Sequence, residues 1–272
     1  MHQSARKVTS LPEIANVVLL GIIEGITEFL PISSTGHLLI AEQWLGQRSD
    51  LFNIVIQAGA MLAVTLVYRK RLLDLAIGLR RPENLAYAVK LIAAFLITAV
   101  LGLVAKNAGF SLPTSLGPVA WALIVGGVWI LASERWLRRQ QPRFTVTWAT
   151  VIAVGVAQVV AGIFPGTSRS AACIFAAIFA GTTDRAAATE FTFLVGIPTM
   201  YAASAYELYD QSKVGFAGED FGMLALAFIV STGVAFVAVK WLLGFIRNHS
   251  FCVFAYYRII FGTLLLTLAA AT

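Results

Sequence analysis

The chain has 272 residues, of which 58% are hydrophobic and only 12% are charged. Soluble globular domains carry about 25% charged residues, so the composition excludes a water-soluble fold and predicts a membrane protein. The net charge of +6 does not indicate nucleic-acid binding, because the basic residues lie in short segments between apolar runs and are not interleaved with aromatic residues.

The sequence predicts neither a disulfide framework, nor a zinc site, nor a removable signal peptide. Cys173 and Cys252 lie in apolar runs without the spacing of a disulfide framework or a zinc site. The apolar run after Leu11 contains Glu24 and Glu28 and lacks a small-residue cleavage site. We therefore expect the first apolar run to belong to the mature protein.

Ten apolar segments follow one another along the chain. They span residues 13–31, 36–46, 51–68, 85–105, 117–133, 146–164, 168–181, 187–205, 221–243 and 251–271. The segments 36–46 and 168–181 are too short to span a bilayer, and each follows a break at Pro31 or Pro165, which predicts two re-entrant helical hairpins. The six segments outside these hairpins approach the about 20 residues that a crossing needs and predict full transmembrane helices.

The connections between the segments predict the orientation. The 69–84 connection holds five basic residues and the 134–143 connection holds four, whereas the 206–220 connection holds four acidic residues and one lysine. Basic connections face the cytoplasm in most membrane proteins. We therefore expect the 106–116 and 206–220 connections to face outward, with the first hairpin entering from outside and the second from the cytoplasm.

Each half of the chain begins with a broken pair, which is two apolar segments separated by the break at Pro31 or Pro165. Three predicted transmembrane crossings follow each broken pair. An odd number of crossings would turn the second half upside down relative to the first. The pattern predicts one all-α membrane domain of two inverted repeats, about residues 10–140 and 144–272, with a site where the two broken elements meet near the midplane. Aligning Pro31 with Pro165 also aligns Ser34 with Ser168.

The first broken segment carries acidic and nucleophilic side chains. Glu24 and Glu28 are four residues apart, which places both carboxylates on one face of a helix. Such a pair is typical of a general acid/base or of a hard-cation site, and a purely structural pair is the alternative. Ser34 and His37 follow the break, and either could attack phosphorus. Helix capping by the serine-rich turn is the alternative for this stretch.

The second broken segment carries a cationic side chain in an apolar setting. It reads PGTSRS over residues 165–170. Glycine and hydroxyl residues at a helix start supply N–H groups that bind anions, and Arg169 adds a planar fork that matches phosphate oxygens. A structural salt bridge from Arg169 to Glu24 or Glu28 is the alternative. Three further polar residues are weaker candidates without a predicted role: Gln57, Glu190 and Tyr201.

The motifs EGITEFLPISSTGH, residues 24–37, and PGTSRS, residues 165–170, resemble those of the bacterial undecaprenyl-diphosphatase family, the bacitracin-resistance type. The resemblance covers essentially the whole chain. It implies hydrolysis of undecaprenyl diphosphate to undecaprenyl phosphate, which recycles the lipid carrier for cell-wall synthesis. It also implies a place in the cytoplasmic membrane with the site open to the periplasmic side, a divalent cation such as Mg²⁺ or Ca²⁺, and a homodimer.

The resemblance also implies roles for individual residues. By their positions in the motifs, Glu24 and Glu28 would be the acid/base or metal-binding carboxylates. Ser34 and His37 would be the nucleophile and its partner, and Arg169 would bind the phosphate. We favour Ser34 as the attacking group. The remaining motif residues carry over as substrate-binding donors: Ser33, Thr35, Gly166, Thr167, Ser168 and Ser170.

The chain departs from the family pattern after the arginine motif. Ala171 and Cys173 stand where the family has Gly and Thr, and a thiol is a poorer hydrogen-bond donor than a hydroxyl. We therefore do not expect Cys173 to bind phosphate.

Two other functions remain open from the sequence. A lipid-phosphate transporter or flippase is the main alternative, because inverted repeats with broken helices are the architecture of many secondary carriers. A phosphatidic-acid-type lipid phosphatase is disfavoured, because no histidine follows Arg169 at the spacing of that family.

Overall fold

A computed structural model describes residues 12–109, 115–216 and 218–271, and this part of the chain is all-α with eleven helices. In chain order they are α1 (Glu13–Thr27), α2 (Ser34–Leu45), α3 (Asp50–Val67), α4 (Arg69–Ile77), α5 (Pro82–Asn107), α6 (Leu116–Leu137), α7 (Trp148–Ile163), α8 (Arg169–Phe179), α9 (Arg185–Val214), α10 (Phe221–Asn248) and α11 (Cys252–Ala271). The predicted all-α fold is confirmed.

Five of the described helices are long and apolar enough to cross a membrane: α3, α5, α6, α10 and residues 252–269 of α11. The sixth predicted crossing, 187–205, lies in α9. This helix has 30 residues and thus more than the about 20 that a crossing needs, but its composition is less apolar. The first half of α9 buries Phe191, Leu194 and Val195 in the main core, so this part of the helix can tolerate polar residues, whereas most residues after Met200 are exposed.

The structure has one helix that the sequence analysis missed. The 69–84 stretch is predicted as a connection, but α4 occupies its first half. Leu75 of α4 is buried in the main core, whereas Leu73 and Ile77 are exposed. A nine-residue helix is too short to show a helical period among five basic residues, which explains why the pattern did not predict it.

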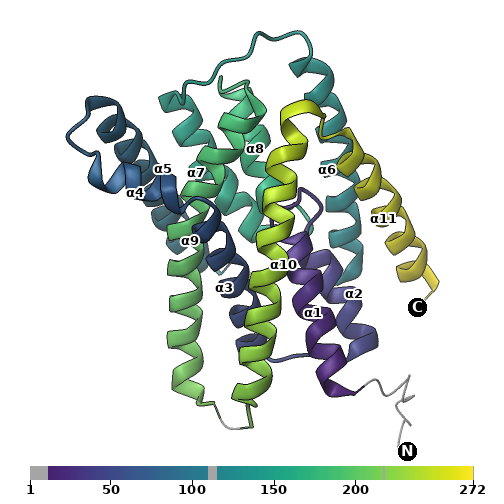
Figure 1. Cartoon of the computed structure of the whole chain (residues 1–272). Coiled ribbons are helices and arrows are strands. Elements are labelled where there is room, and N and C mark those ends of the chain that lie inside the picture. Colours follow the sequence, from purple (N-terminus) through teal and green to yellow (C-terminus); the bar gives the residue numbers. More distant parts are fainter. Residues whose placement is uncertain (1–11, 110–114, 217, 272) are drawn as a thin grey trace, which may run out of the picture.

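The two broken pairs enter the molecule from opposite ends (Figure 1). α1 rises from the end that carries the 206–220 connection, and α2 returns toward that end. α7 descends from the end that carries α4 and the connection after α6, and α8 returns there (Figure 1). At 1.5 Å per residue, α1 is roughly 22 Å and α7 roughly 24 Å long, about half of the roughly 40–45 Å thickness of a whole bilayer, which places both breaks near mid-depth. The inverted repeat itself stays a prediction.

Small residues allow the helices to approach closely. α6 packs along α11, and α10 packs along α3 and α1. A Cβ atom at Gly25 would lie 2.8 Å from the Ser231 carbonyl oxygen, and one at Gly59 would lie 2.7 Å from the Phe228 carbonyl oxygen. Since lipid provides no hydrophobic drive between helices, such close backbone contact is a main source of their attraction in membranes.

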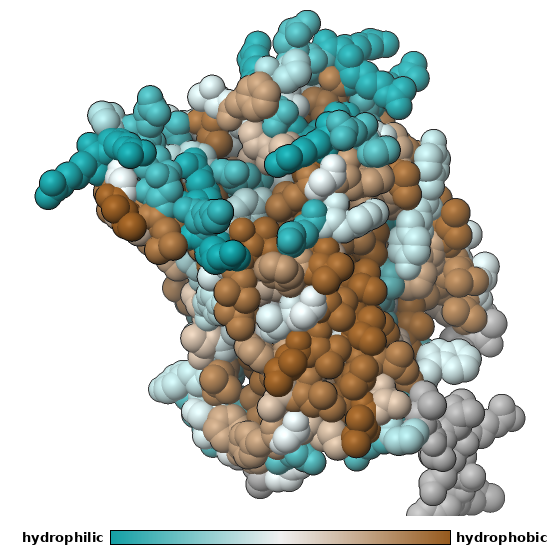
Figure 2. Space-filling model, in the orientation of Figure 1, coloured by the Kyte–Doolittle hydropathy of each residue, from teal (hydrophilic) through white to brown (hydrophobic). Residues whose placement is uncertain are grey.

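The surface is divided into a hydrophobic middle and hydrophilic ends (Figure 2). Hydrophilic residues gather over α4 and the 138–147 connection at one end and are sparser at the other. Both basic connections therefore share one end, as the sequence predicts, and the acidic 206–220 connection lies at the opposite end (Figure 1). A multi-pass membrane protein follows from this division.

Candidate active site

The two chain breaks share an unusual backbone conformation. Ser33 precedes α2 with φ 73°, and Ser168 precedes α8 with φ 67°. They are the non-glycine residues with positive φ in the described part of the chain. Such a conformation costs about 1–3 kcal/mol and is found mostly at functional sites. The structure thus pairs Ser33 with Ser168, one residue away from the predicted pairing of Ser34 with Ser168.

The first break brings the predicted nucleophile and a carboxylate into contact. The Ser34 hydroxyl donates a hydrogen bond of 2.5 Å to Oε2 of Glu28. Glu28 follows the last residue of α1 and Ser34 opens α2, so the break folds the chain back and joins the two side chains. A serine that donates to a carboxylate has the geometry of a nucleophile with its general base.

Glu24 lies one turn behind Glu28 and is completely buried. Neither of its carboxylate oxygens accepts a hydrogen bond. Its electrostatic neighbours are Glu28 and Arg169, so charges from both breaks act on this carboxylate. The predicted meeting of acidic and cationic groups is therefore present in the fold.

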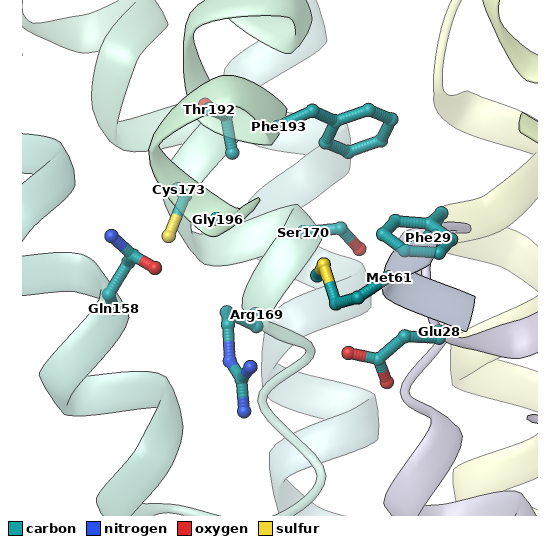
Figure 3. A pocket seen from close by; sticks show the side chains of 10 residues that line it. All are labelled: Glu28, Phe29, Met61, Gln158, Arg169, Ser170, Cys173, Thr192, Phe193 and Gly196. Atoms are coloured by element: carbon teal, nitrogen blue, oxygen red, sulfur yellow. The ribbon is translucent and has the colours of Figure 1, made fainter. Parts of the chain in front are cut away.

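Arg169 opens α8 and faces Glu28 across a cavity (Figure 3). No salt bridge within 4.0 Å joins Arg169 to a carboxylate in the described residues. Its Nη1 is buried without a hydrogen-bond acceptor. The alternative of a structural salt bridge to Glu24 or Glu28 is thus not observed, and the guanidinium remains available to an anion.

A second cavity, of about 40 Å³, joins the two breaks. It is lined by residues of the first break, of the second break and of α3 and α7: Glu28, Ser33, Ser34, Thr35, Gly166, Ser168, Arg169, Gln57 and Ala161. Buried polar groups in proteins are nearly always satisfied. Arg169, which lines this cavity with its Nη1 unpaired, is therefore suited to bind an anionic ligand there.

His37 points away from this cavity. Its Nδ1 is 2.7 Å from the Ser33 carbonyl oxygen, and its Nε2 is 2.6 Å from the Tyr257 hydroxyl. The ring also stacks on Phe261, with centroids 4.4 Å apart. Both ring nitrogens are thus engaged outside the cavity, and α11 holds the ring in place.

The predicted substrate-binding residues separate into two groups. Ser33, Thr35, Gly166 and Ser168 line the cavity. Thr167 and Ser170 do not line it: the Thr167 N–H donates to the Phe164 carbonyl at 3.2 Å, and the Ser170 hydroxyl donates to the Leu30 carbonyl at 3.0 Å and so ties the second break to the first.

The weaker candidates lie at different depths. Gln57 lines the cavity, whereas Glu190 pairs with Arg71 at 3.2 Å near the basic connections. Tyr201 contacts the Thr65 hydroxyl at 3.4 Å. Cys173 is buried beside Arg169, with Sγ 4.0 Å from the Val154 carbonyl oxygen.

The sequence analysis singled out Arg169 and missed a second arginine inside an apolar run. Arg258 of α11 is completely buried, and its guanidinium contacts both breaks. Its position in an apolar run was the available signal, because charged residues inside membrane helices are usually functional. Its partners are backbone carbonyls, which leave no trace in a sequence.

Two openings adjoin the cavity. Gln57 also lines a polar mouth of about 470 Å³ between α3 and α9, together with Asp50, Asn53, Glu207 and others, at the end of the 206–220 connection. Arg169 also lines a groove of about 320 Å³ between α5, α7 and α9. Small and apolar residues make up much of this groove, including Gly102, Ala105, Gly162 and Ile163. One opening thus suits water and the other suits a lipid chain.

Comparisons with known proteins agree with this geometry. A curated undecaprenyl-diphosphatase of Rhizobium etli (strain CIAT 652) is 66% identical over 257 residues, covering 94% of this chain and 97% of its own. A Xanthomonas axonopodis pv. citri protein of the same name is 57% identical over 263 residues, covering 96% and 99%. The family described as bacitracin resistance protein BacA matches residues 17–264. The chain therefore belongs to the bacitracin resistance protein BacA family.

Proposed function

We propose that this protein hydrolyses undecaprenyl diphosphate to undecaprenyl phosphate and inorganic phosphate. The observation that carries the proposal is the shared cavity, which holds Ser34 bonded to Glu28 on one side and Arg169 on the other. A nucleophile, a base and an anion-binding cation are what phosphoryl transfer requires. The names of the relatives favour this reaction over transport of the lipid.

The geometry supports Ser34 as the attacking group. Its oxygen attacks the terminal phosphorus while Glu28 accepts the hydroxyl proton, and the bond from phosphorus to the bridging oxygen breaks. Undecaprenyl phosphate leaves. Glu28 then releases this proton to solvent, accepts a proton from the attacking water and passes it to the Ser34 oxygen as the bond from phosphorus to that oxygen breaks. This step releases inorganic phosphate and restores Ser34 and Glu28. His37 does not line the cavity, so the same geometry favours a supporting role for that residue.

Arg169 and the start of α8 bind the diphosphate. The free end of a helix presents unpaired N–H groups and a partial positive charge, which attract phosphate oxygens. Gly166 and Ser168 line the cavity at this end of α8. The guanidinium adds two parallel donors for the same oxygens, so the second break supplies most of the positive potential.

The residues also fit the divalent cation that the family resemblance implies. Glu24 offers two buried oxygens without donors, and Glu28 lies one turn away. No cluster of three His, Cys, Asp or Glu residues gathers in the described part of the chain. Two carboxylates completed by substrate phosphates and water are the usual surroundings of Mg²⁺. Such an ion would neutralise phosphate charge between Glu24, Glu28 and the substrate.

The openings support a cytoplasmic-membrane protein whose site faces the periplasm. The polar mouth lies at the end opposite the basic connections, which is the outer end by the positive-inside rule. The groove would leave the polyprenyl chain in lipid. A homodimer is part of the same proposal on the strength of the resemblance, and light scattering of the detergent-solubilised protein tests it.

The reaction is tested with purified protein in detergent and undecaprenyl diphosphate. We expect release of inorganic phosphate, its loss with EDTA and its return with Mg²⁺. Thermal shift on adding Mg²⁺ should be present in the wild type and absent in Glu24→Gln. Absence of phosphate release by the wild type, with undecaprenyl diphosphate moved across vesicles intact, would contradict the proposal.

A further inference from the structure

Arg258 is the largest fully buried side chain of the described residues. It lies on α11, outside both sequence motifs. It forms no salt bridge within 4.0 Å in the described part of the chain. A charge buried in a membrane helix without a carboxylate partner is costly and is usually kept for function.

The guanidinium of Arg258 is saturated with hydrogen bonds. A guanidinium has five N–H donors, and five bonds are observed. Nε and Nη2 donate to Leu123 and Ala122 of α6 at 3.3 and 3.0 Å. These bonds fix the arginine on a long helix of the scaffold.

The remaining donors reach both chain breaks. Nη1 donates to the Pro31 carbonyl at 3.3 Å and to the Thr167 carbonyl at 3.1 Å. Nη2 donates to the Gly166 carbonyl at 3.0 Å. A single nitrogen therefore joins the loop that precedes Ser34 to the loop that precedes Arg169.

These bonds also orient backbone amides at the cavity. A trans peptide unit is planar, and its C=O and N–H point in opposite directions. Because the Thr167 carbonyl faces Arg258, the N–H of Ser168 points away from α11. Ser168 lines the cavity, so the bond from Arg258 fixes the orientation of a peptide unit in the cavity wall.

We propose that Arg258 is a positioning residue for phosphoryl transfer, which sets the distance between the nucleophile of the first break and the anion site of the second. The inference rests on the proposed phosphatase function. A displacement of about 1 Å in such an arrangement can cost roughly 100-fold in rate. We therefore expect variants at this contact to lower kcat more than they raise KM.

The structure provides a way to disturb Arg258 without replacing it. Gly126 of α6 faces the guanidinium, and an added Cβ would overlap Nη2 of Arg258. Gly117, on the same helix, has open space around it. Gly126→Ala should displace the arginine with its charge retained, and Gly117→Ala is the matched control.

The experiment measures kcat and KM for phosphate release by wild type, Arg258→Lys, Gly126→Ala and Gly117→Ala. We expect kcat to fall ~10-fold to 100-fold in the first two variants, KM to change less, and Gly117→Ala to match the wild type. Lysine keeps the charge but has one nitrogen and three donors, so it should not restore kcat. Gly126→Ala keeps the test open if Arg258→Lys does not fold.

Two further results separate positioning from a general loss of stability. The double variant of Gly126→Ala and Arg258→Lys should be no slower than the slower single variant, because both disturb one contact. Wild-type kcat in folded Arg258→Lys, or equal losses in Gly126→Ala and Gly117→Ala, would overturn the inference. An inactive wild type would instead reject the proposed phosphatase function.

Discussion

The helices that follow the two breaks are buried to different extents. α8 buries most of its length, including Cys173, Ile174 and Phe175, whereas α2 buries only Ser34 and Gly36. Both begin after a serine with positive φ. Both turns are buried, with Ser33 and Ser168 each less than a tenth exposed, so the breaks differ in the helix that follows: α8 lies in the core and α2 at the edge of the bundle.

This difference indicates that the anion site and the nucleophile are held in place in different ways. The anion site around Arg169 is held by the packing of α8 against α7 and α9. The nucleophile on α2 has less packing of its own, and residues of α11 support its break: Arg258 bonds to the Pro31 carbonyl and Tyr257 to His37. The position of α2 thus depends on contacts with α11, and the predictions below test that dependence.

The largest expected effect is at Ser34. Ser34→Ala removes the proposed nucleophile and should lower kcat by roughly 10⁴-fold or more, while the exposed Ser212→Ala should not change it. Mass spectrometry of rapidly quenched wild type should find phosphate on Ser34. A phosphorylated His37 in its place would transfer the nucleophilic role to the histidine.

At the second break, Arg169→Ala should lower kcat/KM by about 1000-fold, the range of arginines that stabilise phosphoryl transfer. The unpaired guanidinium holds no described carboxylate, so the melting temperature in detergent should change little. Arg80→Ala, on the exposed basic connection, is the control. Phosphate release at the normal rate would remove Arg169 from the mechanism.

A smaller effect is expected at His37. His37→Ala loses the bond to Tyr257 and the stack on Phe261, and should lower kcat about 10-fold by loosening α2. Tyr257→Phe removes only the hydroxyl and should cost less. A loss in His37→Ala as complete as that in Ser34→Ala would show that the histidine acts on the substrate directly.

The smallest expected effect is on stability at the two serines. Glycine adopts positive φ without strain, so Ser33→Gly should raise the free energy of unfolding by about 1 kcal/mol. Ser168→Gly should gain less, because the Ser168 hydroxyl also accepts from the Ala171 N–H and caps α8. Thermal melting of both variants in detergent gives the ranking, and a larger gain for Ser168→Gly would reverse the comparison.

Much of the fold could be predicted from the sequence because lipid constrains it strongly. Long apolar runs must become helices in a bilayer, and Pro31 and Pro165 mark breaks that no simple membrane helix would contain. The charge of the connections predicted which helix ends lie together. α4 could not be predicted, because an amphipathic helix of nine residues is too short to show a clear period in its hydrophobic residues.

The acidic and cationic residues of the candidate site could be predicted from the sequence. The residues that hold them in position could not. Glu28, Ser34 and Arg169 carry side-chain chemistry in an apolar setting, which a sequence displays. The orientation of His37 depends on Tyr257 and Phe261 of a distant helix, and Arg258 binds carbonyls that every residue possesses. Such long-range contacts to the backbone require coordinates.

The groove between α5, α7 and α9 has a consequence for which lipids are processed. Its lining includes Arg169, the charged Lys106 and Glu207, and several small residues such as Gly102, Ala105 and Gly162. Only the first isoprene units of a bound substrate would lie against protein, and the later ones would remain among acyl chains. We therefore expect turnover at saturation to be nearly the same for short and long prenyl diphosphates, and a steep rise of kcat with every added unit would contradict this.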